Sequence, residues 1–348
     1  MINIEDYGFE YKDVIEASDI PARITAVHKE RYTMVCKYGE IKGILKSGLY
    51  FNGSYADFPA VGDFVLINYN DKGDSLIIKT LPRKSYFTRS NNFGKLGEQA
   101  IAANFDYVFI LMSLNKDFNI ARLERYMAIA WQSGGIPGVI LTKANLCQDA
   151  ESYVAEAESS APGVDVISVS ALTRYGIDRI KSLLRPRKTA IFLGSSGVGK
   201  STLINCIAEE ELMKTGDIRQ EDSKGRHTTT YRQLIMTKEK FMIIDTPGMR
   251  EIGLWDAMEG LSEAFLDISA LEKSCRFSDC THTKEPGCAI IEALENGSLS
   301  PDRWKNYQKL KNENLRSEDK MAYLRMWREK IRTMEKSQRH AYKNRNKR

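Results

Sequence analysis

The stretch G-S-S-G-V-G-K-S, residues 194–201, decides the fold of this 348-residue chain. It directly follows an apolar run, T-A-I-F-L at residues 189–193, and it precedes a helical pattern, T-L-I-N-C-I-A at residues 202–208. A buried strand, a glycine-rich loop and a helix, in that order, form the phosphate-binding loop of nucleoside triphosphatases. The sequence therefore predicts an α/β domain that binds a nucleotide by its phosphates.

The residue types of this loop suit phosphate binding. Its glycines let backbone N–H groups approach the phosphates, and the helix that follows adds a favourable partial charge at its N-terminus. We expect Lys200 to reach the β- and γ-phosphates and to take part in catalysis, and the Ser201 hydroxyl to bind magnesium. The nucleotide contacts predicted here are Gly194, Ser195, Ser196, Gly197, Val198, Gly199, Lys200, Ser201 and Thr202.

Two downstream segments complete the predicted phosphate end of the site. D-T-P-G, residues 245–248, follows the apolar strand F-M-I-I, which is where an acid assists magnesium binding. Asp245 takes that role, and the Gly248 N–H is expected near the γ-phosphate. In K-G-R-H-T-T-T-Y, residues 224–231, Thr229 or Thr228 is expected to contact magnesium and sense the γ-phosphate as part of a switch loop.

Two upstream segments, T-K-A-N at residues 142–145 and S-A at residues 170–171, resemble the base-reading pattern of GTPases, which is N/T-K-x-D at one strand end and S-A at the next. Both stand before the phosphate loop here, whereas in ordinary GTPases both follow it. The chain order therefore predicts a circular permutation of the same sheet. The residues expected to bind the base are Thr142, Lys143, Ala144, Asn145, Ser170 and Ala171.

The remaining patterns predict a multidomain α/β protein. Residues 20–81 contain about five short strand patterns separated by glycines, which indicates a small β-barrel, with an OB-fold as one candidate. From residue 105, apolar strands alternate with helical patterns at 120–132, 150–159 and 176–184, while 83–103 read as a polar connecting segment. We expect an OB-like β-barrel over 1–82, a circularly permuted P-loop GTPase domain over 83–262 and a zinc-binding α-helical module over 263–348.

Three of the six cysteines cluster within fourteen residues, in C-R-F-S-D-C-T-H-T-K-E-P-G-C at 275–288. Clustered cysteines in an intracellular protein indicate a metal before a disulfide. Three thiolates and one imidazole suit a closed, tetrahedral, structural zinc site without a position for catalysis. The predicted zinc ligands are Cys275, Cys280, His282 and Cys288.

The positive charge is concentrated at the end of the chain. Residues 303–348 carry sixteen Lys and Arg against five Asp and Glu, a net of +11, so the rest carries −6 of the overall +5. A polyanion such as RNA is a plausible partner for this segment, and a solvated charged helix that binds nothing is the alternative. The sequence contains neither a membrane-spanning apolar run nor an apolar signal-peptide core, so we expect a cytoplasmic protein.

These motifs together resemble the RsgA/YjeQ family of circularly permuted GTPases, and the resemblance covers nearly the whole chain. It implies a monomeric GTP hydrolase that uses GTP/GDP, Mg²⁺ and one structural Zn²⁺. It also implies that the partner is the small ribosomal subunit with its rRNA, and that the subunit stimulates hydrolysis during late maturation.

In Ras-like enzymes a glutamine after the glycine of D-x-x-G orients the attacking water, but Met249 occupies that position in this chain. The resemblance suggests His227 as the residue that positions water instead, and a loop histidine without a catalytic role is the alternative.

One position departs from the family pattern. The base reader ends in Asn145 instead of an aspartate that accepts two hydrogen bonds from guanine. A neutral amide has one acceptor and brings donors, so we expect weaker guanine preference and a drift towards xanthine, unless the backbone at 170–171 retains guanine. Two other functions compete with the GTPase: a P-loop kinase or ATPase, which does not need this base reader, and a nucleotide-sensing RNA-binding protein with little turnover.

Overall fold

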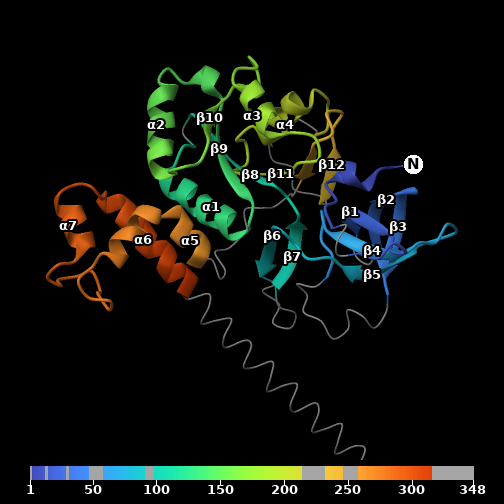
Figure 1. Ribbon diagram of the computed structural model, residues 1–348. Coiled ribbons are helices and arrows are strands. Elements are labelled where there is room, and N and C mark those ends of the chain that lie inside the picture. The colour runs from blue at the N-terminus through green and yellow to red at the C-terminus, as the bar shows by residue number, and fades with distance from the viewer. Residues whose placement is uncertain are drawn as a thin grey trace, which may run out of the picture.

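The computed structural model describes a central α/β domain with a barrel on one side and a group of helices on the other (Figure 1). The structure describes residues 2–11, 15–28, 31–46, 58–90, 98–115, 117–213, 232–245 and 258–315. No helix among these described residues is both long and apolar enough to cross a membrane.

The N-terminal strands form a closed five-stranded barrel, which confirms the predicted β-barrel. Its strand order is β1-β2-β3-β5-β4, and β4 pairs again with β1 to close the ring. The inward side chains Ile24, Met34, Val65 and Ile77 are buried and fill the interior. The strands are β1 (Pro21–His28), β2 (Arg31–Cys36), β3 (Gly39–Leu45), β4 (Phe64–Asn68) and β5 (Ser75–Thr80).

The central sheet has the strand order β10-β9-β8-β11-β13-β12. The first five strands are parallel and β12 is antiparallel. Strands such as Y-V-F-I-L-M-S are almost continuously apolar because helices cover both faces of a parallel sheet. The strands are β8 (Tyr107–Ser113), β9 (Ile136–Thr142), β10 (Val166–Ser168), β11 (Thr189–Gly194), β12 (Gln233–Met236) and β13 (Met242–Asp245).

Four helices cover this sheet, and their positions agree with the helical patterns in the sequence. α1 (Ile120–Gln132) and α2 (Ala150–Ser160) share one apolar core with the sheet, and α3 (Ile177–Leu183) and α4 (Lys200–Ala208) share the other. Asn119 begins α1 by accepting a hydrogen bond from the backbone N–H of residue 122 at 2.8 Å. Because the strands between these helices are parallel, their carboxyl ends lie at one edge of the domain.

The expectation of a plain connecting segment over 83–103 was wrong. This segment contains an antiparallel pair of strands, β6 (Tyr86–Ser90) and β7 (Glu98–Ala103). Phe87 is buried and stacks on Phe105, with ring centroids 4.9 Å apart. The sequence E-Q-A-I-A-A has weak strand propensity, and burial against the central domain decides its conformation.

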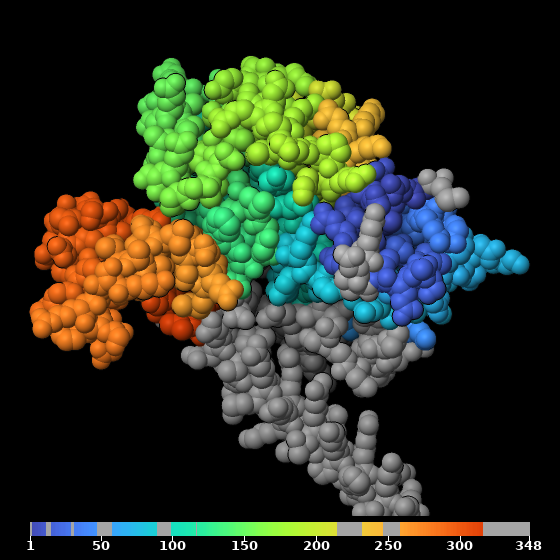
Figure 2. All heavy atoms as spheres, viewed as in Figure 1, coloured from blue at the N-terminus to red at the C-terminus, as the bar shows by residue number. Residues whose placement is uncertain are grey.

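The C-terminal helices share the apolar core of the central domain. They are α5 (Met258–Ala264), α6 (Leu266–Lys273), α7 (Ala289–Glu295) and a helix over residues 301–315. Gly260 lets α5 pack closely on α1, because a Cβ at this position would lie 2.2 Å from the Ala128 carbonyl oxygen. The predicted boundary between the second and third domains, at residues 262 and 263, falls within α5. Figure 2 shows these helices against the central domain, on the side away from the barrel.

Arg303 joins helix 301–315 to the central domain. Its guanidinium donates to Glu124 of α1 at 2.6 Å and to both carboxylate oxygens of Asp267 in α6 at 2.8 Å. It also lies 4.7 Å above the Phe265 ring. The Glu124 side chain is 1% exposed, so this buried carboxylate depends on Arg303 for its counter-charge.

Arg23 joins the barrel to the central domain. This β1 residue is 1% exposed, and it donates to the carbonyl oxygens of Gly62 and Asn104 at 3.2 and 2.8 Å and to the Thr189 hydroxyl at 3.0 Å. Its guanidinium lies 4.8 Å from the centre of the Phe64 ring. Burial lowers the pKa of Arg23 to about 10, so the side chain stays charged at neutral pH. One buried cation therefore binds the barrel, the end of β7 and the start of β11.

We expect Arg23→Met to destabilise the protein by about 3 kcal/mol or more, because buried carbonyl groups lose a charged donor. The matched control is Arg31→Met, since Arg31 is 66% exposed in its pair with Asp74. This exposed pair contributes roughly 1 kcal/mol at most. Urea unfolding followed by circular dichroism measures both. Equal midpoints for the two variants would contradict the role given to Arg23.

Candidate nucleotide-binding site and metal centre

The phosphate loop lies between β11 and α4. β11 ends at Gly194, and α4 begins at Lys200 with Gly199 as its N-cap. Gly197 and Gly199 have φ angles of 77° and 97°, a backbone conformation that glycine adopts most readily. Between them Val198 is 1% exposed and anchors the loop in the apolar core. The loop is thus bent around one buried side chain, with a helix N-terminus at its end.

The serines of the loop differ in their surroundings. The Ser195 hydroxyl donates to Asp117 at 2.7 Å, and Asp117 is paired with Arg122 at 2.9 Å. Ser196 is exposed, and Ser201 on α4 is half-buried with the exposed Thr202 beside it. Asp117 and Arg122 were missed by the sequence analysis, and no motif marks them, because they lie almost eighty residues before the loop and reach it only through the β8–β11 pairing.

Lys200 and Asp245 meet at the phosphate end of the site. The Lys200 ammonium nitrogen lies 3.4 Å from the Asp245 carboxylate, and both side chains are less than one-third exposed. β11 and β13 are neighbouring parallel strands, so the residues that follow them lie side by side. A lysine and an acid predicted for phosphate and magnesium therefore face one another.

The predicted base reader is hydrogen-bonded to the phosphate loop. Thr142, at the end of β9, donates its hydroxyl to the Val198 carbonyl at 2.6 Å. Lys143 donates to the Gly197 carbonyl at 2.7 Å and has a φ of 62°, an unusual conformation for a residue with a side chain. Segments more than fifty residues apart thus form one continuous site.

A hydrogen bond joins the side chains of Ser170 and Asn145. The Ser170 hydroxyl accepts from the Thr173 backbone N–H at 3.2 Å and donates to Asn145 Oδ1 at 2.8 Å. The amide oxygen is therefore engaged with protein, and the other end of the amide is a hydrogen-bond donor. Nearby, the Ala171 carbonyl accepts from the Cys206 thiol of α4 at 3.6 Å, and the Ala144 N–H donates to Val169 at 3.0 Å.

The structure brings most of the predicted nucleotide contacts to one edge of the central sheet. They follow the carboxyl ends of β9, β10, β11 and β13, where open α/β sheets bind ligands. The roles assigned to these residues stay predictions. His227, Thr228, Thr229, Gly248 and Met249 lie outside the described residues.

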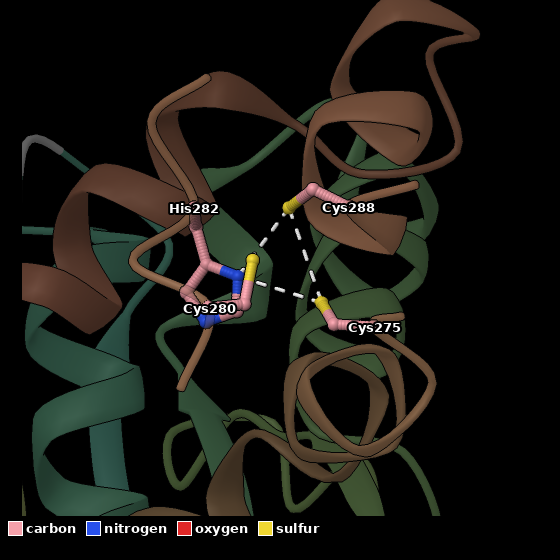
Figure 3. Close-up of side chains that lie close together, drawn as sticks. All are labelled: Cys275, Cys280, His282 and Cys288. Atoms are coloured by element: carbon pink, nitrogen blue, oxygen red, sulfur yellow. Dashed lines mark hydrogen bonds between the residues drawn. The ribbon is translucent and has the colours of Figure 1, made fainter. Parts of the chain in front are cut away.

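The four predicted zinc ligands form a cluster at the C-terminal module. Their ligand atoms all lie within 4.8 Å of one another and point toward a common centre (Figure 3). His282 Nδ1 is 3.4 Å from Cys288 Sγ and 3.6 Å from Cys275 Sγ, and these two sulfurs are 3.9 Å apart. Zinc bonds of about 2.0 Å to nitrogen and 2.3 Å to sulfur give tetrahedral edges of about 3.5 and 3.8 Å. The donor set and its spacing therefore fit one zinc ion.

The electrostatics of the cluster also favour a cation. Desolvation raises the pKa of the Cys280 thiol to about 11, and the neighbouring Cys275 and Cys288 sulfurs add to this rise. For Cys288, burial acts in the same direction, but backbone N–H groups at the start of α7 hold its pKa below the usual range. A divalent cation among these sulfurs would favour all of them as thiolates.

Glu285 shapes the loop that carries His282, and it was missed by the sequence analysis. Its carboxylate accepts from the backbone N–H groups of Thr281, Thr283 and Lys284 at 3.0, 2.9 and 3.0 Å. Hydrogen bonds from the Thr281 hydroxyl and these N–H groups hold the pKa of Glu285 well below its usual range. The loop is thereby held with His282 at a φ of 59°.

We expect the purified protein to contain about one zinc ion per chain and to lose it in a strong chelator, with a fall in the thermal stability of the C-terminal helices. Cys275→Ser should lose the metal because one thiolate ligand is removed. Cys147→Ser is the matched control, since Cys147 lies outside the cluster. Atomic absorption and thermal unfolding measure these effects, and equal zinc content in both variants would contradict the assignment.

Comparisons with known proteins agree with this architecture. The family model described as RsgA GTPase matches residues 80–255. The protein named small ribosomal subunit biogenesis GTPase RsgA 1 is 44% identical over 350 residues in Listeria innocua and 43% identical over 347 residues in Listeria monocytogenes. These alignments cover 99% and 98% of this chain, and 99% of each relative.

Solved structures show the same fold. The crystal structure of YjeQ from Thermotoga maritima superposes with a TM-score of 0.65 and 26% identity, over 85% of this chain and 99% of that one. YloQ, described as a circularly permuted GTPase, superposes with a TM-score of 0.60 over 87% of this chain and 96% of that one, and at 22% identity it supports the fold alone. With the permuted strand order and the full-length relatives, these findings confirm the resemblance: the chain belongs to the RsgA GTPase family.

Proposed function

We propose that this protein hydrolyses GTP, binds the small ribosomal subunit and assists its late maturation, with hydrolysis stimulated by the subunit. The observation that carries the nucleotide part is the pair of hydrogen bonds from Thr142 and Lys143 to the phosphate loop. A kinase or ATPase has no need of a T-K-x-N segment fastened to its phosphate loop. This geometry favours a nucleotide whose base and phosphates bind to two segments that contact each other.

The proposed partner is the small subunit with its rRNA. The support is the printed name of the relatives, which are small ribosomal subunit biogenesis GTPases, and the net charge of +11 over residues 303–348. Lys and Arg side chains bind RNA largely through its phosphates, and small barrels commonly bind single-stranded nucleic acid. Most of the basic segment, residues 316–348, lies outside the described residues.

The proposed cofactors follow from the two sites. GTP/GDP would bind the phosphate loop and the base reader, with Mg²⁺ held by Ser201 and Thr229 and supported by Asp245. One structural Zn²⁺ would bind the cysteine and histidine cluster. We further propose a monomer in the cytoplasm, built from domains over 1–82, 83–262 and 263–348.

Hydrolysis is proposed to depend on Lys200, Thr229 and His227. Lys200 would stabilise charge on the γ-phosphate, and Thr229 would hold magnesium. Because Met249 cannot orient water, His227 is proposed to position the attacking molecule. A turnover assay with GTP, ATP and XTP, with and without small subunits, tests the function. Subunit-stimulated GTP turnover supports it, ATP turnover indicates another P-loop enzyme, and binding without turnover indicates a nucleotide sensor.

A nucleotide-sensing RNA-binding protein with weakened guanine selectivity is the second candidate. The Ser170–Asn145 hydrogen bond favours it, because Asn145 then offers a donor where guanine also has donors at N1 and the 2-amino group. Xanthine has a carbonyl at this position and would accept from the amide. Reversing the amide would restore an acceptor for guanine, but it would remove the acceptor of the Ser170 proton.

We expect Asn145→Asp to raise GDP affinity about tenfold or more, because hydrogen bonds to a charged group contribute about 1.5–3 kcal/mol each. XDP affinity should fall, and weak ADP binding should not change. Calorimetry with the three diphosphates measures this. Tight binding of GDP alone by the unaltered protein, with no rise in GDP affinity in the variant, would refute the idea that Asn145 weakens guanine selectivity.

We expect His227→Ala to lower the subunit-stimulated GTP turnover by a factor on the order of 10², the lower end of what a positioned catalytic group contributes. GDP affinity and cosedimentation with small subunits are the controls, and both should be retained. An unchanged stimulated rate would exclude His227 from catalysis.

A further inference from the structure

His282 faces the metal cluster with one ring nitrogen and helix α6 with the other. Nδ1 lies 3.4 and 3.6 Å from two cysteine sulfurs, so it is the nitrogen placed to bind the metal. Nε2 lies 3.6 Å from Oε1 of Glu272. A histidine that binds a metal through one nitrogen is commonly oriented by a carboxylate at the other. Glu272 stands in that place.

Glu272 is also the acceptor for two side chains of helix 301–315. Tyr307 donates its hydroxyl to Glu272 at 2.9 Å, and Lys311 donates to the oxygen that faces His282, also at 2.9 Å. Glu272 is only 23% exposed at its side chain, and Tyr307 is 3% exposed. The two donors hold the carboxylate in one orientation beside the imidazole.

Aromatic packing joins the same helix to the His282 ring. The Trp304 ring meets the His282 ring edge-on, with centroids 5.7 Å apart, and it stacks on Tyr307 at 5.6 Å. These side chains, with Glu272 and Lys311, line a recess beside the cluster. Helix 301–315 contributes no metal ligand, yet it contacts the imidazole ligand and its carboxylate partner.

The same helix is fastened to the central domain. Besides the Arg303–Glu124 pair, Arg125 of α1 donates to both carboxylate oxygens of Glu313 at 2.6 and 2.7 Å. Because Arg303 and Glu313 both pair with side chains of α1, helix 301–315 has little freedom to move away from the cluster. Its contacts with Glu272 are therefore preorganised by the fold.

We propose that Glu272 is a positioning residue of the metal centre, and that through Tyr307 and Lys311 helix 301–315 is part of the metal-binding unit. Glu272 orients the His282 ring so that Nδ1 faces the metal, and the two helix side chains orient Glu272. Retention of the metal thus depends on a helix that supplies no ligand. The proposal rests on the assignment of zinc to Cys275, Cys280, His282 and Cys288.

The test compares zinc release from the full chain in Glu272→Gln, Tyr307→Phe and Lys311→Met, with Glu295→Gln as control. Glu295 is an exposed acid of α7, and it undergoes the same change of charge away from the cluster. Transfer of zinc to a chromophoric chelator gives the release rate, and the visible bands of the cobalt-substituted protein report the ligand geometry.

We expect zinc release to be roughly 10–100-fold faster in Glu272→Gln, as is typical when a carboxylate partner is lost. Tyr307→Phe and Lys311→Met should show smaller accelerations, and Lys311→Arg should restore the rate. The cobalt bands should shift in Glu272→Gln and stay unchanged in Glu295→Gln.

Release rates and cobalt bands equal to those of the control, in a protein that holds zinc, would overturn the role of Glu272. If Glu272→Gln does not fold, Tyr307→Phe decides, because it keeps the buried ring and removes only the hydroxyl. A wild-type protein without zinc would refute the metal assignment itself, which is distinguishable from the first outcome.

Discussion

Two hydrogen bonds, from Thr142 and Lys143 to carbonyl groups of the phosphate loop, hold the nucleotide site of this protein together. They are possible because β8 lies between β9 and β11 in a parallel sheet, so that all three strands end at one edge. The order in which the strands occur along the chain does not matter for this contact. A permuted chain therefore brings the predicted base reader into contact with the phosphate loop, although the predicted base reader comes first in the sequence.

The barrel and the C-terminal helices lie on different sides of the central domain, and an arginine contributes to each junction. Arg23 donates to the carbonyl groups of Gly62 and Asn104 and to the Thr189 hydroxyl, whereas Arg303 neutralises the buried carboxylate of Glu124. Burying a guanidinium is costly unless its donors are engaged, so each arrangement tolerates few other geometries. These contacts act together with the pairing of β1 and β12 and with the apolar core that the C-terminal helices share with the central domain.

At both candidate sites, contacts with neighbouring side chains constrain the predicted residues in a way that residue type alone does not. At the predicted base reader, the Ser170 hydroxyl accepts from the Thr173 N–H and donates to the amide oxygen of Asn145. At the metal cluster, Glu272 lies next to the free nitrogen of His282, while Glu285 holds the loop. In each case a side chain from another segment of the chain contacts the predicted residue on one side.

The sequence by itself determined the glycine-rich loop, the permuted order, the barrel and the four-residue cysteine–histidine cluster, because each depends on short-range spacing or on strand and helix periodicity. Only the tertiary structure decided the β6–β7 pair, whose alanine-rich second strand forms through burial rather than propensity. The same holds for Asp117 beside Ser195, Arg23 in the barrel interface and Glu272 beside His282. These contacts join residues brought together by packing, and a charged side chain in the sequence carries no sign of the distant group that it will meet.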